Sequence, residues 1–130
     1  SVWASTNGDI WNLALDLDNG KFYAGKNGSY YGEDGNASDP VTASNPGYAI
    51  TANRFGDSNT KYNYQIFIGL RNDGSETNGI YLNQGNPNGN FAITSNSGDG
   101  YADANGYGKF QYQPPSGYYA MCTKNLKQYG

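Results

Sequence analysis

The chain opens with two runs of alternating apolar and polar residues that meet at the dipeptide Asn19-Gly20. Asn-Gly is the dipeptide best suited to a two-residue type I′ turn, so the pattern predicts a hairpin of strands Ile10–Asp18 and Lys21–Lys26. In this register Asp18 lies opposite Lys21, and the two faces of the hairpin differ sharply. The polar face carries Asp16, Asp18, Lys21 and Tyr23. The apolar face, which we expect to form core, carries Leu13, Leu15, Leu17, Phe22 and Ala24.

Further segments of strand length follow, separated by loops rich in glycine and asparagine. The most apolar is Tyr62–Leu70, which places alternate tyrosine, isoleucine and leucine side chains on one face. The polar stretch Gly32–Pro46 predicts a surface loop. Shorter strands are expected at Tyr48–Asn53, Gly79–Asn83, Phe91–Ser95, Lys109–Gln113 and Tyr118–Thr123. Strands with turn signals every 8–12 residues are typical of a sandwich or barrel, and no internal repeat is present.

Composition supports one all-β domain over residues 1–130. The 130 residues include 19 glycines and 13 tyrosines but only 8 Lys plus Arg and 11 Asp plus Glu. Glycine favours tight turns and tyrosine favours pleated sheets. The net charge of −3 argues against a nucleic-acid partner, because phosphate contacts need clustered basic residues. No apolar run approaches the roughly 18 residues of a membrane span, so no membrane insertion is expected.

Catalytic chemistry has little support in the residues. The chain has no histidine, which removes the commonest general base and most metal-binding sets. The single cysteine, Cys122, therefore lacks a histidine partner and is predicted to be a small buried side chain on a strand. Asp16 and Asp18 alternate on one strand face, as carboxylates do on the catalytic strand of concanavalin-type glucanases, but the flanking glutamates are absent. We therefore predict a protein that is not an enzyme.

No metal site or cofactor is predicted either. A calcium loop of the EF-hand kind that started at Asp16 would need glycine at its sixth position and glutamate at its twelfth, where the chain has Lys21 and Asn27. The segment Gly98–Asp103 offers a weaker calcium signal, since it combines carboxylates with a glycine-rich backbone. Whether loops of this kind bind calcium stays open at this point.

Two phrases of the sequence resemble the SPRY domain, and more closely the SPRY-like modules of phage and environmental-virus structural proteins. The first runs from Gly8-Asp9-Ile10 through Ala14-Leu-Asp-Leu-Asp-Asn-Gly-Lys21 to Lys26-Asn27-Gly28. The second is Phe110-Gln-Tyr-Gln-Pro-Pro-Ser-Gly-Tyr-Tyr-Ala-Met-Cys-Thr-Lys-Asn-Leu126. The resemblance implies an antiparallel two-sheet sandwich of jelly-roll type and a recognition surface without chemistry.

The resemblance also implies a role on the exterior of a virus particle, as a tail-fibre, decoration or other structural module. Expected partners are other virion subunits, further copies of the chain, or a host-surface glycan or protein. A SPRY domain has several strands before its Gly-Asp-Ile hairpin, whereas only Ser1–Asn7 precede it here. We therefore expect another chain, or an N-terminal part outside this sequence, to complete the sandwich.

Tyrosines in or beside loops are the candidate binding residues. A tyrosine offers a flat apolar ring and a hydroxyl, which suit both sugar stacking and protein interfaces. The candidates are Tyr30, Tyr31, Tyr101 and Tyr107. Two alternative functions stay open: a carbohydrate-binding, lectin-like domain, and a concanavalin-type glycoside hydrolase that uses Asp16.

Overall fold

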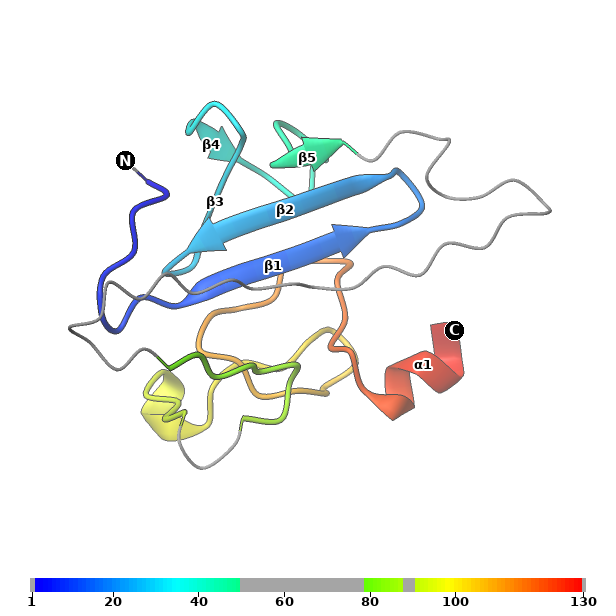
Figure 1. Cartoon of the computed structure of the whole chain (residues 1–130). Coiled ribbons are helices and arrows are strands. Elements are labelled where there is room, and N and C mark those ends of the chain that lie inside the picture. Colours follow the sequence, from blue (N-terminus) through cyan, green and yellow to red (C-terminus); the bar gives the residue numbers. More distant parts are fainter. Residues whose placement is uncertain (1, 50–78, 88–90, 130) are drawn as a thin grey trace.

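The computed structural model describes residues 2–49, 79–87 and 91–129 (Figure 1). Their regular structure is mostly β and forms one antiparallel sheet of five strands, which confirms the β-rich part of the prediction. The strands are β1 (Trp11–Asp16), β2 (Lys21–Lys26), β3 (Ser29–Tyr31), β4 (Ala37–Ser38) and β5 (Tyr48–Ala49). A 3₁₀ turn, η2 (Asn96–Gly98), and a short helix, α1 (Thr123–Tyr129), follow.

The opening hairpin forms, but its register differs from the predicted one by two residues. Asp16, not Asp18, lies opposite Lys21, so Leu17–Gly20 make a four-residue loop. The Asp16 carboxylate accepts hydrogen bonds from the Asn19 backbone N–H at 3.0 Å and from its side-chain amide at 2.8 Å. Of the dipeptide, only Gly20 has positive φ, at 66°, whereas a type I′ turn needs positive φ at both central residues. The aspartate-capped loop therefore replaces the expected turn.

A turn with type I′ dihedral signs occurs instead at Asn27-Gly28, between β2 and β3. Its φ angles are 53° and 87°, and the strands pair from Lys26 and Ser29 outwards. The Asn27 side chain accepts a hydrogen bond from the Ile10 N–H at 2.9 Å, which ties the turn to the start of β1. The turn chemistry that was expected at Asn19-Gly20 thus operates at the next Asn-Gly dipeptide along the chain.

The sheet buries the face that the alternation pattern assigned to solvent. Tyr23 is 0% exposed and Ala14 is 7% exposed, whereas Leu13 and Leu15, on the other face, are 39% and 42% exposed. The expectation that the leucines form core is wrong for the described residues. Ala14 is small and lies directly opposite Tyr23 in the register, so a second layer can approach this face closely around the Tyr23 ring.

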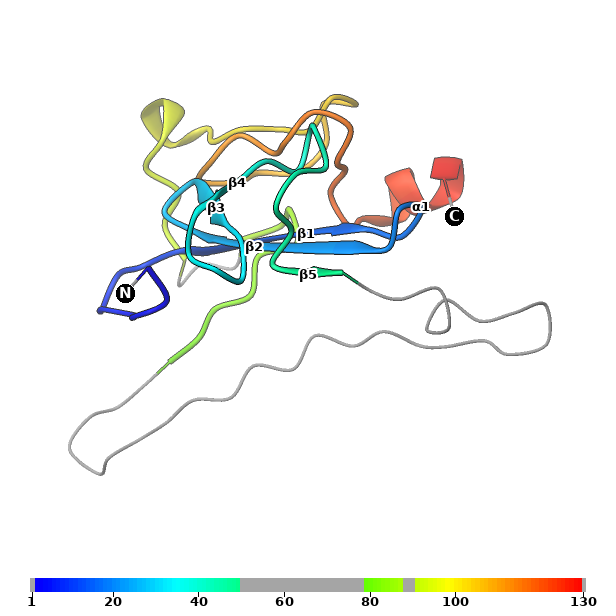
Figure 2. The ribbon, with the colours of Figure 1, turned by 90° about the horizontal axis from the view of Figure 1, so that it is seen from above.

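This second layer consists of turns and irregular segments rather than a second regular sheet. Figure 2 shows the yellow and orange segments, about residues 91–122, on one side of the β1–β2 pair. The Tyr118 ring packs edge-on against Tyr23 at 6.3 Å between centroids, and its hydroxyl donates to the Pro40 carbonyl at 3.2 Å. Within the described residues, the β-type backbone pairing in this layer is an isolated antiparallel bridge between Tyr101 and Phe110.

Side-chain amides explain why several predicted strands are irregular. The Gln111 carbonyl oxygen accepts from the Thr94 N–H at 2.9 Å, and the Asn83 amide donates to the Lys109 carbonyl at 2.8 Å. Backbone groups bonded in this way are lost to a ladder with a neighbouring strand. Predicted strands without strand structure are Gly79–Asn83, Phe91–Ser95, Lys109–Gln113 and Tyr118–Thr123.

The end of the chain and the 32–46 segment also differ from expectation. The Ala120 N–H donates to the Asp103 carboxylate rather than to a neighbouring strand, and α1 begins at Thr123. Cys122 is therefore a partly exposed residue just before a helix, not a buried residue on a strand. The polar segment Gly32–Pro46 contains the short strand β4 in addition to its loops.

Two remaining predictions fall wholly or partly outside the described residues. The strand at Tyr62–Leu70 lies outside them, and of Tyr48–Asn53 only the first two residues are described, as β5. In the part of the chain that the structure describes, no helix has the length and apolar character needed to cross a membrane.

Candidate functional site: an exposed apolar sheet face

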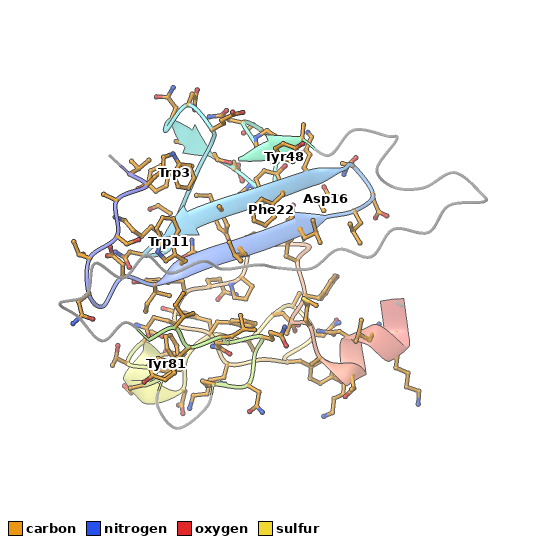
Figure 3. All side chains as sticks on the ribbon, viewed as in Figure 1. Trp3, Trp11, Asp16, Phe22, Tyr48 and Tyr81 are labelled. Atoms are coloured by element: carbon orange, nitrogen blue, oxygen red, sulfur yellow. The ribbon has the colours of Figure 1, made fainter. Side chains whose placement is uncertain are left out.

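The outer face of the sheet gathers large apolar side chains from four strands. Residues directly opposite each other in an antiparallel ladder lie on the same face, so the register places Trp11 and its neighbours together. We call this surface the apolar face: Trp3, Trp11, Leu13, Leu15, Phe22, Tyr31 and Tyr48. Figure 3 shows Trp3 beside Trp11, and Phe22 beside Tyr48.

Aromatic rings cluster at one end of the apolar face. Trp3 stacks on Trp11 with 6.0 Å between ring centroids and 6° between ring planes, and the Tyr31 ring meets Trp3 edge-on at 6.3 Å. The Trp11 indole N–H donates to the Ser5 hydroxyl at 3.2 Å. Both tryptophans nevertheless stay more than a third exposed, at 37% for Trp3 and 39% for Trp11. The cluster is therefore ordered by its own contacts and open to a partner.

The N-terminal segment is held across this end of the sheet by charge and hydrogen bonds. The Lys26 ammonium donates to the Ala4 carbonyl at 2.7 Å and lies 3.4 Å from the Asp9 carboxylate. Asp9 also accepts from the Thr6 N–H at 2.8 Å and from the Asn27 amide at 2.7 Å. The hydrogen bonds from Thr6 and Asn27 hold the pKa of Asp9 far below its usual range. These contacts position Trp3 over Trp11.

The four candidate tyrosines do not form one site. Tyr31 lies on the apolar face, whereas its neighbour Tyr30 lies on the opposite face, where burial raises its pKa to about 12. Tyr101 and Tyr107 belong to the irregular layer: Tyr101 bridges to Phe110, and the Lys124 ammonium lies 4.9 Å from the centre of the Tyr107 ring. Of the four, Tyr31 is the one that the structure brings into the aromatic cluster.

The aspartates that resembled a catalytic pair have other surroundings. Both oxygens of Asp16 accept hydrogen bonds from Asn19, which closes the hairpin loop. Asp18 is exposed in that loop, and the Lys21 ammonium donates to the Ala43 carbonyl at 2.6 Å instead of pairing with Asp18. The predicted pairing of Asp18 with Lys21 is wrong, because the register places Asp16 opposite Lys21.

Asp103, in the segment with a calcium signal, is a buried hydrogen-bond acceptor. One oxygen accepts from the N–H groups of Asn105 and Tyr107, each at 2.9 Å. The other accepts from the Ala120 N–H at 2.9 Å and the Asn125 amide at 2.7 Å. Burial opposes ionisation, but these hydrogen bonds outweigh it and lower the pKa of Asp103. Four N–H donors surround the carboxylate, which suits a structural anchor and disfavours binding of a cation.

In residues 2–49, 79–87 and 91–129, no three histidine, cysteine, aspartate or glutamate side chains lie close enough together to hold a metal ion.

No protein-family model matches the chain, and no curated protein or solved structure matches it. The arrangement itself must therefore indicate what the chain can bind.

The apolar face can bury surface against a partner, and its aromatic end can stack on a flat apolar ligand. Sequence reasoning did not select Trp3, Trp11 or Tyr48. Trp11 was missed because the alternation assigned the odd-numbered positions of β1 to the core, whereas Trp3 and Tyr48 lie outside β1. One signal was available: Trp11 continues the odd-numbered series of Leu13 and Leu15, so the face extends to a tryptophan. A row that large at a sheet edge is typical of interfaces as well as of cores.

Proposed function

We propose that the chain is a non-enzymatic structural and recognition module of a virus particle, most simply a tail-fibre, decoration or other exterior protein of a phage. In this proposal it works outside cells and makes protein contacts through the apolar face. Its partners are neighbouring virion subunits, further copies of the chain, or a host-surface molecule. The resemblance to SPRY-like viral modules motivates the virion part of the proposal.

The exposed apolar face is the observation that carries the contact function. Five of its residues, Trp3, Trp11, Leu13, Leu15 and Tyr48, are between 37% and 48% exposed. If a large side chain offers about 200 Å² for burial, these exposures together leave roughly 400 Å² of apolar surface uncovered. The largest apolar patch on a typical soluble monomer is about 300–600 Å², and patches of this size are often functional.

A two-sheet sandwich is the finer fold that we propose for the functional state. The described sheet has the irregular layer on one face and the apolar face on the other. Sheets pack about 10 Å apart in sandwiches, with the apolar side chains of both inner faces interdigitated. A second sheet packed on the apolar face would give the SPRY-like arrangement that the sequence resembles.

Protein analysis of purified particles tests the proposed function. Mass spectrometry of particles from the source organism should find the chain, and antibodies against it should label the particle exterior. Detection of the chain only among free secreted or cellular proteins would refute the virion assignment. Because this experiment depends on location, it does not require the identity of the contacting partner.

Carbohydrate binding is the second candidate, favoured by the Trp3–Trp11–Tyr31 cluster. Indole and phenol rings stack on the apolar faces of sugars, and this cluster is both ordered and exposed. Binding on a glycan array that is lost in Tyr31→Ala and kept in Tyr101→Ala would support it. The matched control is apt because Tyr101 lies in the irregular layer. Absence of binding on a broad array would remove this candidate.

A further inference from the structure

We infer that the partner of the apolar face is a second copy of this chain, packed face to face about a two-fold axis. The inference rests on the proposed function, since it names the partner of the same surface. Two sheets joined in this way would form a sandwich, each copy supplying one sheet. Every copy would then bury its Trp11–Leu13–Leu15 row against the row of the other.

The size of the apolar face suits such a dimer. Interface cores are about 65% apolar, so roughly 400 Å² of apolar surface corresponds to roughly 600 Å² of total surface on each copy. Two copies then bury about 1,200 Å², which is the lower end of the range for specific protein interfaces. An interface of that size gives a reversible dimer whose population depends on protein concentration.

The chemistry of the face is self-complementary, as a two-fold interface requires. Its central row, Trp11, Leu13 and Leu15, contains no charge that would meet a like charge on the other copy. Lys26 lies directly opposite Trp11 on the same face, 3.4 Å from the Asp9 carboxylate, and donates to the Ala4 carbonyl. The Lys26 charge is therefore paired within each copy, so that two faces can approach without leaving this cation unpaired.

Dimer formation can be followed by mass and by tryptophan emission. The chain contains two tryptophans, Trp3 and Trp11, and both lie on the apolar face. Sedimentation equilibrium of the full chain should show a monomer–dimer equilibrium, and the tryptophan emission should shift to shorter wavelength as the dimer population rises. Leu15→Asp places a charge inside the interface and should weaken dimerisation by at least about thirtyfold, the effect of a hot-spot residue.

Val41→Asp is the matched control, because Val41 is more exposed than Leu15, at 55% against 42%, and lies outside the apolar face. It should dimerise like the parent chain. Far-ultraviolet circular dichroism must show that both variants keep the parent fold; Leu15→Thr, which adds no charge, replaces Leu15→Asp if that variant unfolds. A monomeric mass at all concentrations, or equal weakening by Leu15→Asp and Val41→Asp, would overturn the inference. A glycan that shifts the emission of a monomer would likewise overturn it in favour of the lectin.

Failure here is distinguishable from failure of the proposed function. A monomeric chain that is found in particles refutes the two-fold dimer and leaves the virion role standing. A dimeric chain that is absent from particles refutes the virion role, while the loss of dimer in Leu15→Asp still identifies the face.

Discussion

Asp103 should be the most sensitive polar residue in the described part of the chain. The residue is 6% exposed, and its carboxylate accepts four hydrogen bonds, two of them from Ala120 and Asn125. Asp103→Asn keeps the shape but replaces one acceptor oxygen with an amide that donates. Two buried N–H groups then face a donor or lose their acceptor, whichever way the amide turns.

The expected cost follows from these contacts. A hydrogen bond to a charged group is worth about 1.5–3 kcal/mol, so loss of two gives roughly 3–6 kcal/mol. That is a large part of the about 5–15 kcal/mol that stabilises a typical domain. In a urea titration with an m-value of about 2 kcal/mol/M, the midpoint should fall by roughly 1.5–3 M.

Urea unfolding followed by far-ultraviolet circular dichroism measures this change at one low protein concentration. Asp99→Asn is the control, since Asp99 is exposed and lies four residues earlier in the same glycine-rich segment. It removes the same charge and should leave the midpoint nearly unchanged. If Asp103→Asn shifts the midpoint no more than Asp99→Asn does, the anchoring role of Asp103 is wrong.

The pH dependence has a definite sign. The pKa of Asp103 is lowered in the folded protein, so the folded state binds its proton more weakly than the unfolded state does. Its contribution is therefore complete above the unfolded value of about 3.9 and is lost as the pH falls through the lower folded value. The parent chain should lose stability in that acid range, and Asp103→Asn should lose less.

Three further substitutions test other parts of the structure. Gly25→Ala should destabilise the protein by several kcal/mol, as measured by urea unfolding, because the added Cβ would collide with the Ser29 carbonyl. In the control Gly47→Ala the nearest atom to the added Cβ would be 3.6 Å away, so the urea midpoint should change little. Asp9→Asn should weaken the near-ultraviolet circular dichroism of the stacked tryptophans, since it removes the ion pair that holds the N-terminal segment; an unchanged spectrum would contradict this. Burial raises the pKa of Tyr30 to about 12, so Tyr30→Phe should remove the phenolate transition near pH 12 from an alkaline absorbance titration. The stability that depends on neutral Tyr30 should be lost as the pH rises from about 10, the value in the unfolded chain, through 12.

The sequence was a good guide to the opening hairpin and a poor guide to its environment. Alternation correctly paired Leu13 and Leu15 with one face and Asp16 with the other, because side-chain period in a strand is fixed by the pleat. It could not show which face is covered, since that depends on segments more than 70 residues away in the sequence, such as Tyr118 packed on Tyr23. From apolarity alone the leucines were expected in the core, whereas the structure buries the small Ala14 and the large ring of Tyr23.

The sequence predicted which type of side chain would form the candidate site, but not where the site would lie. Aromatic side chains were expected to carry binding, and Tyr31 does lie in the exposed cluster. Trp3 could not be placed from the pattern, because its position depends on the contacts of Lys26 and Asp9 with the N-terminal segment. The second layer was also beyond sequence pattern, since amides such as Gln111 satisfy backbone groups that the pattern had assigned to strands.

The inverted faces bear directly on function. A sheet that packs inward the face with Ala14 and Tyr23 leaves the larger side chains of its other face for contacts with a partner. Burial of a large apolar side chain contributes about 1.5–3 kcal/mol, so a chain that leaves Leu13 and Leu15 half-exposed forgoes stability that a partner can recover. The leucines that were expected to form the core of one chain are therefore the residues through which we propose that it contacts another.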